Sequence, residues 1–446
     1  MERAPRGEKS VLHITPHLGG GVGRVLLNYL AAQVGSSGFS HSVLCLEYAN
    51  ERALAAAGAG GFSLRDKMAE RHADVLEAIR DADVVLVHWW NHPLLNALLV
   101  RETLPACRLI FWSHVSGLYP PQAFNDAALA YPDAFVLTTP VSLRAAEVQR
   151  MPEAKRDRVR VVWSTGGVEH VAEVAPRPHT GFKIGYIGTV DYGKMHPEFL
   201  ELCSLVAIPE AEFVVCGGPS HERIREQARA YHGHFTFTGH VSNINEYLSE
   251  FDVFGYPLAP YHYGTCEQAL GEAMAAGVPP VVLVNLAESF IVEDGVSGIV
   301  AKDARAYVRA LEDLHHRPEL RKRLSEGARA AAHRRFSMTQ LVRDWEAVYT
   351  ETLLSPKLPK RWGGRASGPG VTAAELLIEA LGDHAEPFAR SLAAVAPTED
   401  AAAIDALRAL WSASHQWRSA TGGTPQHYHR FFGDDELLRR WAEAMR

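Results

Sequence analysis

The stretch YGTCEQALGEAMAAGVPPVV, residues 263–282, contains the succession of patterns that decides the fold. A loop with Gly264 and Thr265 leads into an alanine-rich helix, and an apolar run typical of a buried strand follows the helix. Parallel β-sheets are built from helices that alternate with buried strands. The stretch therefore predicts an α/β protein with parallel strands.

The same alternation extends in both directions, from the first residues to about residue 350. Short apolar runs rich in β-branched and aromatic residues are separated by helical patterns. In the first half, strands are predicted at 10–15, 41–46, 84–89, 108–113, 134–138 and 159–163. In the second half, KIGYIG at 183–188 opens a series that continues at 212–216, 234–238, 253–256, 280–284 and 298–300. The sequence thus predicts two doubly wound sheets.

Proline and glycine mark the boundaries between the predicted parts. Residues 173–181 have no periodicity and indicate a linker, so residues 1–172 and 182–354 are predicted to form two Rossmann-like domains, the second with a closing helix. Residues 355–370, SPKLPKRWGGRASGPG, indicate a flexible joint. Residues 371–446 are expected to form a small helical extension, which begins with a capping box at Thr372 and Glu375.

The extension carries aromatic residues at mixed spacings, which favour the core of a helical cap. A platform that binds an acceptor or a partner is the alternative. These residues are Trp411, Trp417, Tyr428, Phe431, Phe432 and Trp441.

Composition excludes several classes of protein. With 45 basic and 52 acidic residues the net charge is −7, which is not the balance of a nucleic-acid-binding protein. Five scattered cysteines without a CxxC pair argue against a disulfide framework or structural zinc and favour a cytoplasmic protein. We expect no secretory signal and no membrane span. Peripheral contact with the inner membrane face stays open, through Lys357, Lys360, Arg361 and Arg365 in the joint.

A glycine-rich loop, GGGVGR, follows the first predicted strand and opens a helix. Its glycines, which would let backbone N–H groups approach an anion at the helix N-terminus, are Gly19, Gly20, Gly21 and Gly23. A dinucleotide fingerprint requires a glycine where Arg24 stands, so that class of site is not predicted. A tight strand-to-helix turn without a ligand is the alternative.

Two carboxylates lie on the helix of the deciding stretch. Glu267 and Glu272 are five residues apart, which does not align them on the helix and argues against a paired acid and base. A carboxylate in the first turns can instead accept hydrogen bonds from ligand hydroxyls, while the preceding loop faces phosphates. Glu272 is expected to be half-buried. A solvated helix face is the alternative and fits Glu267 better.

The segment EAMAAGVPPVV resembles the hallmark helix and strand of the retaining glycosyltransferases of family four, which have the GT-B fold. Further resemblances follow in the same order as in that family. They are IGTVDYGK at 187–194, FVVCGGP at 213–219, FTGHV at 237–241, EDGVSGIVA at 293–301 and RRFSMTQLVRDWEAVY at 334–349. The resemblance covers residues 10 to 352. It implies two Rossmann-like domains facing a cleft, with a nucleotide-diphosphate sugar held by the second domain and an unidentified acceptor held by the first.

The resemblance also implies roles for single residues. Lys194 would neutralise the donor diphosphate, Glu272 would bind the ribose hydroxyls, and His114 in FWSHVSG would lie near the reacting sugar. Catalytic roles fall on His114, Lys194 and Glu267, and the glycine loop borders donor and acceptor. The other residues assigned to the donor are Gly188, Thr189, Val241, Tyr263, Gly264 and Thr265. No metal, cofactor or protein nucleophile is expected.

Two positions depart from the family pattern. Gly264 stands where the family has its first glutamate, eight residues before Glu272, so either Glu267 takes over the contact with the sugar or the contact is absent. Thr189 stands where an arginine is common, so one cationic phosphate contact is lost unless Arg24 or another residue supplies it. These departures keep a second hypothesis open, a non-catalytic GT-B-like partner subunit that binds a nucleotide or a glycan.

Other candidates are weaker. A sugar-nucleotide epimerase of the same architecture fits the helix and closing segment less well. The triplet at Asp81 and Asp83 precedes a strand, whereas ligands of open α/β sheets lie beyond the carboxyl ends, so we expect a helix end rather than a divalent-ion site. The spacings of His88, His92, His114, His427 and His429 match no metal motif. Nucleotide base, sugar, acceptor and any homo-oligomer stay undetermined.

Overall fold

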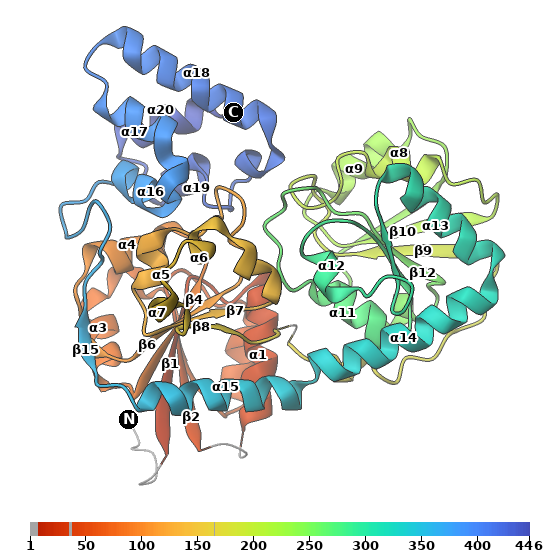
Figure 1. Cartoon of the computed structure of the whole chain (residues 1–446), viewed down its shortest axis with the longest axis horizontal. Helices are drawn as coiled ribbons and strands as arrows, with labels where there is room; N and C mark the ends of the chain where they lie inside the picture. The colour runs from red at the N-terminus through yellow and green to blue at the C-terminus, as the bar shows by residue number, and fades with distance from the viewer. Residues whose placement is uncertain (1–7, 35–37, 165) are drawn as a thin grey trace. The chain divides into compact units, whose positions relative to one another are not determined.

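The computed structural model describes residues 8–34, 38–164 and 166–446, and it divides into two compact units. The first unit comprises Met1–Val162 and Val342–Arg446, and the second comprises Trp163–Leu341 (Figure 1). The second boundary falls inside helix α15 (Met338–Leu353). Residues 163–172 therefore group with the second unit, and residues 342–354 and the helical extension with the first, which differs from the division predicted from proline and glycine content.

The first unit is built on a parallel seven-stranded sheet of order β3-β2-β1-β4-β6-β7-β8. Its strands are β1 (Lys9–Thr15), β2 (Phe39–Cys45), β3 (Ser63–Arg65), β4 (Val84–Trp89), β6 (Leu109–Ser113), β7 (Ala134–Leu137) and β8 (Val159–Val161). The helices between them are α1 (Gly20–Gln33), α2 (Glu51–Gly58), α3 (His72–Asp81), α4 (Pro93–Arg101), α5 (Asp126–Ala130), α6 (Ala146–Gln149) and α7 (Glu153–Arg156). Every residue of β4 is buried, as expected of a central strand covered on both faces.

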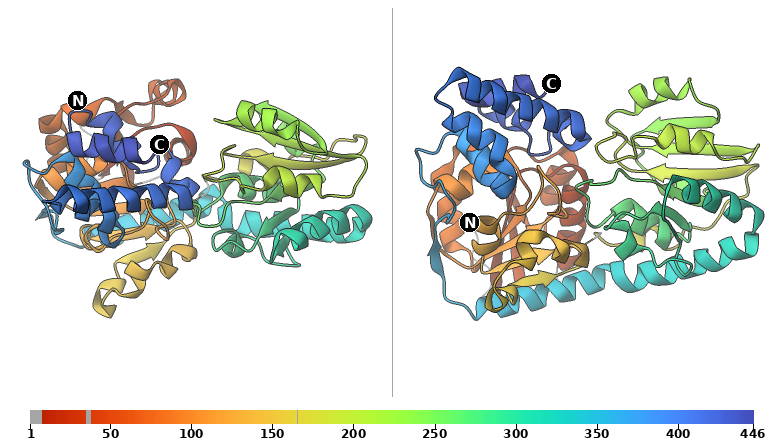
Figure 2. Two further views of the ribbon diagram at one scale, coloured as in Figure 1. Left: turned by 90° about the horizontal axis from the view of Figure 1, so that it is seen from above. Right: turned by 45° about the horizontal axis from the view of Figure 1, so that its top comes forward.

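The helical extension packs on this unit. Its helices are α16 (Ala373–Leu381), α17 (Glu386–Ala393), α18 (Pro397–Ala413), α19 (Pro425–Phe431) and α20 (Glu436–Ala444). Helices α16 and α19 contact α4, and the other three form the layer beyond them (Figures 1 and 2). Trp417, Tyr428 and Trp441 are buried, which confirms the predicted aromatic core for these three residues. The capping box at Thr372 and Glu375 is also confirmed.

The segment predicted as a flexible joint is fixed to the first unit, so that prediction is wrong. Strand β15 (Leu358–Lys360) pairs antiparallel with β5 (Leu104–Cys107), and Lys360 Nζ lies 2.6 Å from an Asp133 carboxylate oxygen. Trp362 is only 4% exposed and donates from Nε1 to Glu379 at 2.9 Å. Proline and glycine content indicates the lack of helix here, but it does not reveal a three-residue strand or a buried indole.

The second unit contains a parallel six-stranded sheet of order β11-β10-β9-β12-β13-β14, with helices on both sides (Figure 2). Its strands are β9 (Phe182–Ile187), β10 (Ala211–Cys216), β11 (His234–Gly239), β12 (Val253–Tyr256), β13 (Pro280–Leu283) and β14 (Ile299–Ala301). Its helices are α8 (Phe199–Ser204), α9 (His221–Ala228), α10 (Asn245–Leu248), α11 (Gln268–Ala275), α12 (Glu288–Ile291), α13 (Ala304–His316) and α14 (Pro318–Phe336). The strands predicted for both halves are confirmed to within two residues at each end.

Two further expectations can be compared with the fold. All five cysteines are free thiols, and four of them are buried. No helix within the described ranges has both the length and the apolar character needed to cross a membrane.

The anchoring of residues 355–370 predicts that Trp362→Ala destabilises the protein by about 3–5 kcal/mol, because the substitution leaves a cavity and deprives Glu379 of a donor. Denaturant unfolding of the full chain measures this loss. Leu358→Ala is the matched control, because Leu358 lies in the same segment but is 52% exposed, and we expect a change of only about 0.5 kcal/mol. Equal, small effects of both substitutions would show that the segment is free after all.

Candidate functional site

The candidate site of the second unit lies where two neighbouring strands end. Strands β9 and β12 are adjacent and parallel, so the loops that follow them meet at the carboxyl edge of the sheet. The loop after β9 carries Lys194, and the loop after β12 carries Glu267 directly before α11. Lys194 Nζ lies 2.7 Å from Glu267 Oε2, which also accepts a hydrogen bond from the Tyr256 hydroxyl at 2.9 Å. The Lys194 ammonium lies 5.8 Å from the centre of the Tyr263 ring.

This ion pair is buried, with 16% of the Lys194 side chain and 2% of the Glu267 side chain exposed. Burial disfavours the charged form of each group, but the opposite charge outweighs it. The Glu267 carboxylate therefore holds the pKa of Lys194 above its usual value, and the Lys194 ammonium holds the pKa of Glu267 below its usual value. Both side chains are charged at neutral pH.

The glycine at 264 is required by the position of the Glu267 carboxylate. A Cβ atom added at Gly264 would lie 2.0 Å from Glu267 Oε1 and 2.8 Å from His262 Nδ1, both closer than atoms can approach. A glutamate at 264 and the observed Glu267 side chain therefore exclude each other. The carboxylate of Glu267 occupies the space next to the position where the family pattern has its first glutamate.

A second pair supports the first. His262 Nδ1 accepts a hydrogen bond from the Gly264 backbone N–H at 3.0 Å, which leaves the ring proton on Nε2. His262 Nε2 faces Glu288 Oε1 at 2.9 Å, and both side chains are buried. Neither residue was predicted from the sequence as part of a site, because neither lies in a motif that resembles the family.

Within the described part of the chain, three of these residues form a group whose ligand atoms are close enough together to hold a metal ion. The ligand atoms of His262, Glu267 and Glu288 lie within 4.8 Å of one another. Imidazole and carboxylate ligands suit zinc. However, the Lys194 ammonium already contacts the Glu267 carboxylate, and a second cation beside it would be repelled. The arrangement is that of a buried charge network centred on an ammonium group.

Glu272 belongs to a separate part of the site. It is fully buried rather than half-buried as predicted, and its Oε1 lies 3.0 Å from both His170 Nε2 and Gln268 Nε2. Glu267 and Glu272 thus bind different partners, in agreement with their spacing on α11. His170 is a functional candidate that the sequence did not indicate, because the 3₁₀ turn that carries it (Glu169–Val171) lies in no motif of the resemblance.

The remaining donor-site candidates shape the backbone of the same edge. Gly188 has φ +155°, and the Tyr186 hydroxyl donates to the Thr189 carbonyl at 2.8 Å. Thr265 is buried and Val241 is partly buried against the core. None of these contacts tests their assignment to a donor, which stays a prediction.

In the first unit the glycine loop forms the tight turn between β1 and α1. Gly20 has φ +59° and begins α1, and a Cβ at Gly23 would lie 2.9 Å from the Leu18 carbonyl carbon. At Gly19 a Cβ would meet the Tyr48 hydroxyl at 2.7 Å, whereas Gly21 has open space. These observations account for Gly20 and Gly23 by backbone geometry and for Gly19 by the nearby Tyr48 hydroxyl, and anion binding by the loop stays a prediction.

The triplet at Asp81 and Asp83 has a structural role, as expected. An Asp83 carboxylate oxygen accepts the Ser10 backbone N–H at 3.0 Å, and the other lies 3.3 Å from Lys9 Nζ. Lys9 and Ser10 begin β1, and Asp83 directly precedes β4, so the triplet lies at the amino edge of the sheet. This is the edge opposite to that used by ligands of open α/β sheets.

The histidines that match no metal motif are nevertheless close together in pairs. His114 follows β6, and its Nε2 lies 2.8 Å from His88 Nδ1. The His92 ring lies 4.8 Å from the His427 ring of the extension. Next to this second pair, Arg430 binds Glu47 at 2.8 Å. The extension therefore covers part of the carboxyl edge of the first unit's sheet.

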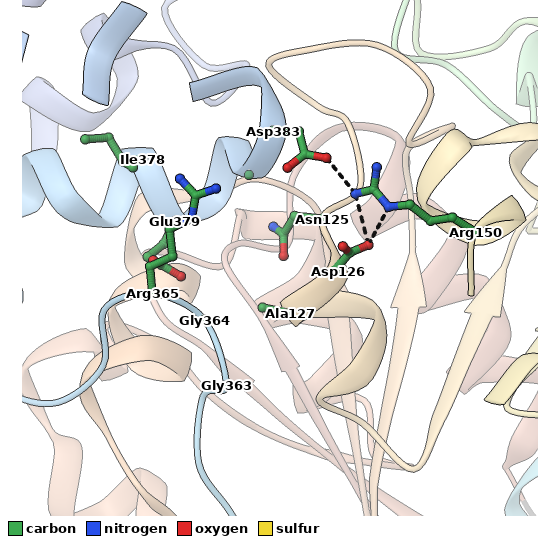
Figure 3. A pocket seen from close by; sticks show the side chains of 11 residues that line it. Asn125, Asp126, Ala127, Arg150, Gly363, Gly364, Arg365, Ile378, Glu379 and Asp383 are labelled. Carbon is green, nitrogen blue, oxygen red and sulfur yellow. Dashed lines mark hydrogen bonds and ion pairs between the residues drawn. The ribbon is translucent and has the colours of Figure 1, made fainter. Parts of the chain in front are cut away.

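A polar pocket of about 330 Å³ lies in the first unit between α5, α6 and the chain around α16 (Figure 3). Arg150 binds Asp126 at 3.0 Å and Asp383 at 2.8 Å. Glu379 accepts hydrogen bonds from Trp362 and the Ala366 N–H. Arg150, Asp126, Asp383 and Glu379 all have protein partners, and the pocket indicates no particular ligand.

Comparison with solved structures shows the same architecture. HepE (Alr3699) of Anabaena, solved with UDP-glucose, superposes with a TM-score of 0.62 at 13% identity, covering 77% of this chain and 99% of HepE. A glycosyltransferase of Rickettsia africae gives 0.62 at 13% identity over 78% of this chain and 99% of its own, and sucrose-phosphate synthase of Thermosynechococcus elongatus gives 0.58 at 16% over 78% and 100%. The chain has the GT-B fold. One Rossmann-like sheet in each unit is the basis of this fold.

In sequence, the match to a known family lies within the second unit. Residues 181–317 match the model of the family "Glycosyl transferases group 1". EpsD of Bacillus subtilis (strain 168), a protein classed as a glycosyltransferase, is 28% identical over 180 residues. This match covers 38% of the present chain and 45% of EpsD, which is less than half of each protein. The matched family segment includes Lys194, Glu267 and Glu272.

The buried ion pair predicts that Lys194→Met destabilises the second unit by about 3–5 kcal/mol, because the Glu267 charge is left buried without its partner. The double substitution Lys194→Met/Glu267→Gln should recover most of this loss. Denaturant unfolding of the wild type, the single variants Lys194→Met and Glu267→Gln, and the double variant completes the cycle. A loss in the double variant equal to the sum of the two single losses would show that the two charges are not coupled.

The same pair predicts a dependence on pH. The pKa of Glu267 is lowered on folding, so its contribution to stability is present above the reference value of 4.5 and is lost as the pH falls through the folded-state pKa. The destabilisation by Lys194→Met should therefore shrink below pH 4.5. Unfolding free energies of wild type and variant, measured on both sides of that value, test this expectation. A loss independent of pH would contradict it.

Proposed function

We propose that this protein is a glycosyltransferase that transfers a sugar from a nucleoside-diphosphate sugar, with the donor diphosphate bound at Lys194. The observation that carries the proposal is the buried Lys194–Glu267 pair at the carboxyl edge of the second unit's sheet. The family match over residues 181–317 supports it, because that segment contains the pair. The whole-chain activity and substrates are part of the proposal, since the sequence matches are partial.

In this proposal Lys194 supplies the positive charge that a departing diphosphate requires. A phosphate oxygen would replace Glu267 as the partner of Lys194 Nζ, while the Tyr256 hydroxyl keeps its hydrogen bond to Glu267 Oε2. The Glu267 carboxylate is then free to accept hydrogen bonds from hydroxyls of the donor sugar, next to Gly264. Glu272, oriented by His170 and Gln268, would accept from the ribose hydroxyls.

The proposal also covers the stereochemistry of transfer and the role of the Lys194 ammonium in place of a metal ion. We propose retention of the anomeric configuration, as in glycosyltransferase family four, with the leaving phosphate assisting deprotonation of the incoming hydroxyl. No protein nucleophile is assigned, because Glu267 is proposed to accept hydrogen bonds from the donor sugar hydroxyls while it stays bonded to the Tyr256 hydroxyl. Lys194 takes the place of a divalent ion. We propose that the first unit binds the sugar acceptor, through His114 and the glycine loop.

We also propose a reducing, cytoplasmic compartment, which the free thiols support.

Binding of a nucleotide can be tested without an acceptor. We expect the melting temperature to rise with one of UDP, GDP, ADP or TDP, and UDP is the first choice because HepE was solved with UDP-glucose. A ligand at ~100 times its dissociation constant adds about 2.7 kcal/mol to stability. Lys194→Ala should abolish the shift.

Lys183→Ala is the matched control. Lys183 is also a lysine of the second unit in an ion pair, with Glu250 at 2.5 Å, but it lies at the amino end of β9. Its replacement should leave the nucleotide shift intact. No shift with any nucleotide, or equal losses in both variants, would contradict the proposed site. A shift without donor hydrolysis or transfer would favour the non-catalytic binding subunit instead.

A further inference from the structure

Four histidines of the first unit form a continuous hydrogen-bonded row, which we call the histidine ladder. It consists of His41 on β2, His13 on β1, His88 on β4 and His114 directly after β6. His41 Nδ1 lies 2.9 Å from His13 Nε2, His13 Nδ1 lies 3.1 Å from His88 Nε2, and His88 Nδ1 lies 2.8 Å from His114 Nε2. Each contact thus joins the Nδ1 of one ring to the Nε2 of the next.

The register of the sheet explains this row. Strands β2, β1, β4 and β6 are neighbours in that order. His41 is paired with Val11, two residues before His13, and His88 is paired with Trp112, two residues before His114. Side chains two residues apart share one face of a sheet. The ladder therefore runs diagonally across one face, from the middle of the sheet to its carboxyl edge, where ligands of such sheets bind.

The imidazoles of the ladder are neutral at neutral pH. His13 and His88 are fully buried, and burial lowers the pKa of each well below its usual value. Burial also lowers the pKa of His41 to about 4 and that of His114 to about 3. A neutral imidazole has one N–H donor and one lone-pair acceptor. Each ring of the ladder can therefore donate on one side only.

Only two arrangements of the protons keep all three hydrogen bonds. Either every ring carries its proton on Nε2, or every ring carries it on Nδ1; a mixture leaves two lone pairs or two N–H groups facing each other. In the first arrangement the extra N–H group lies on His41, at the interior end. In the second it lies on Nδ1 of His114, at the carboxyl edge.

The interior end distinguishes these arrangements. His41 Nε2 is buried and has no hydrogen-bond partner among the described residues. A buried N–H group without an acceptor is rare in proteins and costs about 1–3 kcal/mol. A proton on Nδ1 of His41 is instead donated to His13, which leaves Nε2 with an unpaired lone pair, and buried acceptors without a partner are less rare than buried N–H groups without one. The interior end thus favours the arrangement in which all four rings are protonated on Nδ1.

We propose that the histidine ladder fixes His114 in the Nδ1–H tautomer, so that His114 donates a hydrogen bond and the bound group that it recognises is an acceptor oxygen. A sugar hydroxyl and a phosphate both offer such an oxygen. His88, His13 and His41 are positioning residues that act through His114. Only the identity of the bound group rests on the proposed function, since the tautomer is a property of the ligand-free protein.

The tautomer is measured by long-range ¹H–¹⁵N NMR of the full chain labelled at histidine, in which protonated and unprotonated ring nitrogens give separate signals. Loss of a signal set in His114→Asn assigns His114. We expect protonated Nδ1 and unprotonated Nε2 in the wild-type protein without nucleotide. A proton on Nε2, or comparable populations of both forms, would overturn the proposal, and neither result depends on donor binding.

Two substitutions test the role of the ladder. His88→Phe removes the donor to His114 Nε2, so His114 should lose its single tautomer and populate both. His41→Phe cuts the ladder at the far end and makes the buried Nε2 of His13 the new unpartnered interior end, so the same constraint applies and His114 should keep the Nδ1–H form. If His114 is unchanged in a folded His88→Phe protein, the ladder does not control it. If the His88→Phe protein does not fold, the tautomer of His114 in the wild-type protein decides between support for the proposal and its rejection.

Failure of this proposal and failure of the proposed function are distinguishable. Nucleotide binding with His114 protonated on Nε2 would refute the ladder and leave the donor site intact. An Nδ1–H tautomer without any nucleotide binding would support the ladder and refute the donor site. The His114 signals can be compared after addition of uridine diphosphate and after addition of inorganic phosphate. This comparison shows whether a nucleotide or a simple anion supplies the oxygen that accepts the hydrogen bond from His114.

Discussion

The contact between the Lys194 ammonium and the Glu267 carboxylate constrains the whole carboxyl edge of the second unit. Two opposite charges lie 2.7 Å apart out of water, and the cost of removing them from water is several kcal/mol per ion. Their attraction and the hydroxyl of Tyr256 offset that cost only in this geometry. The geometry in turn requires a glycine at 264, because the carboxylate occupies the space that a side chain there would need. Such pairs are weak sources of stability, and one held at a ligand-binding edge suggests a use in binding.

The sequence predicted the parallel strands well because their signal is local. The run from Val84 to Trp89 is apolar except for His88 and matches β4 at both ends. Strands β3, β5 and β15 were missed because their sequences, SLR, LPAC and LPK, contain no β-branched residue, whereas the equally short β8 and β14 are VRV and IVA. The pairing of β15 with β5 joins distant parts of the chain, so it leaves no local pattern in the sequence. Residues 355–370 have the composition of a joint, although they are packed in the structure.

The candidate site was predictable only in part. The family resemblance indicated Lys194 and Glu272 from short motifs, and Glu267 was named because Gly264 replaces the family's first glutamate. The spacing of the two glutamates agrees with their different partners. A side chain at position 264 would overlap with the Glu267 carboxylate, and this overlap depends on atomic positions that the sequence does not reveal. The histidine ladder was hidden for a similar reason. Its members lie on separate strands, and their diagonal alignment depends on a register that only the folded sheet defines.

A crystal structure of the protein with bound UDP, or with whichever diphosphate raises its melting temperature, tests the central claim most directly. The account predicts a phosphate oxygen about 2.7–2.9 Å from Lys194 Nζ, the distance of a charge-assisted hydrogen bond, with the Glu267 carboxylate still bonded to Tyr256. A nucleotide bound elsewhere, with the contact between Lys194 and Glu267 unchanged, would contradict it.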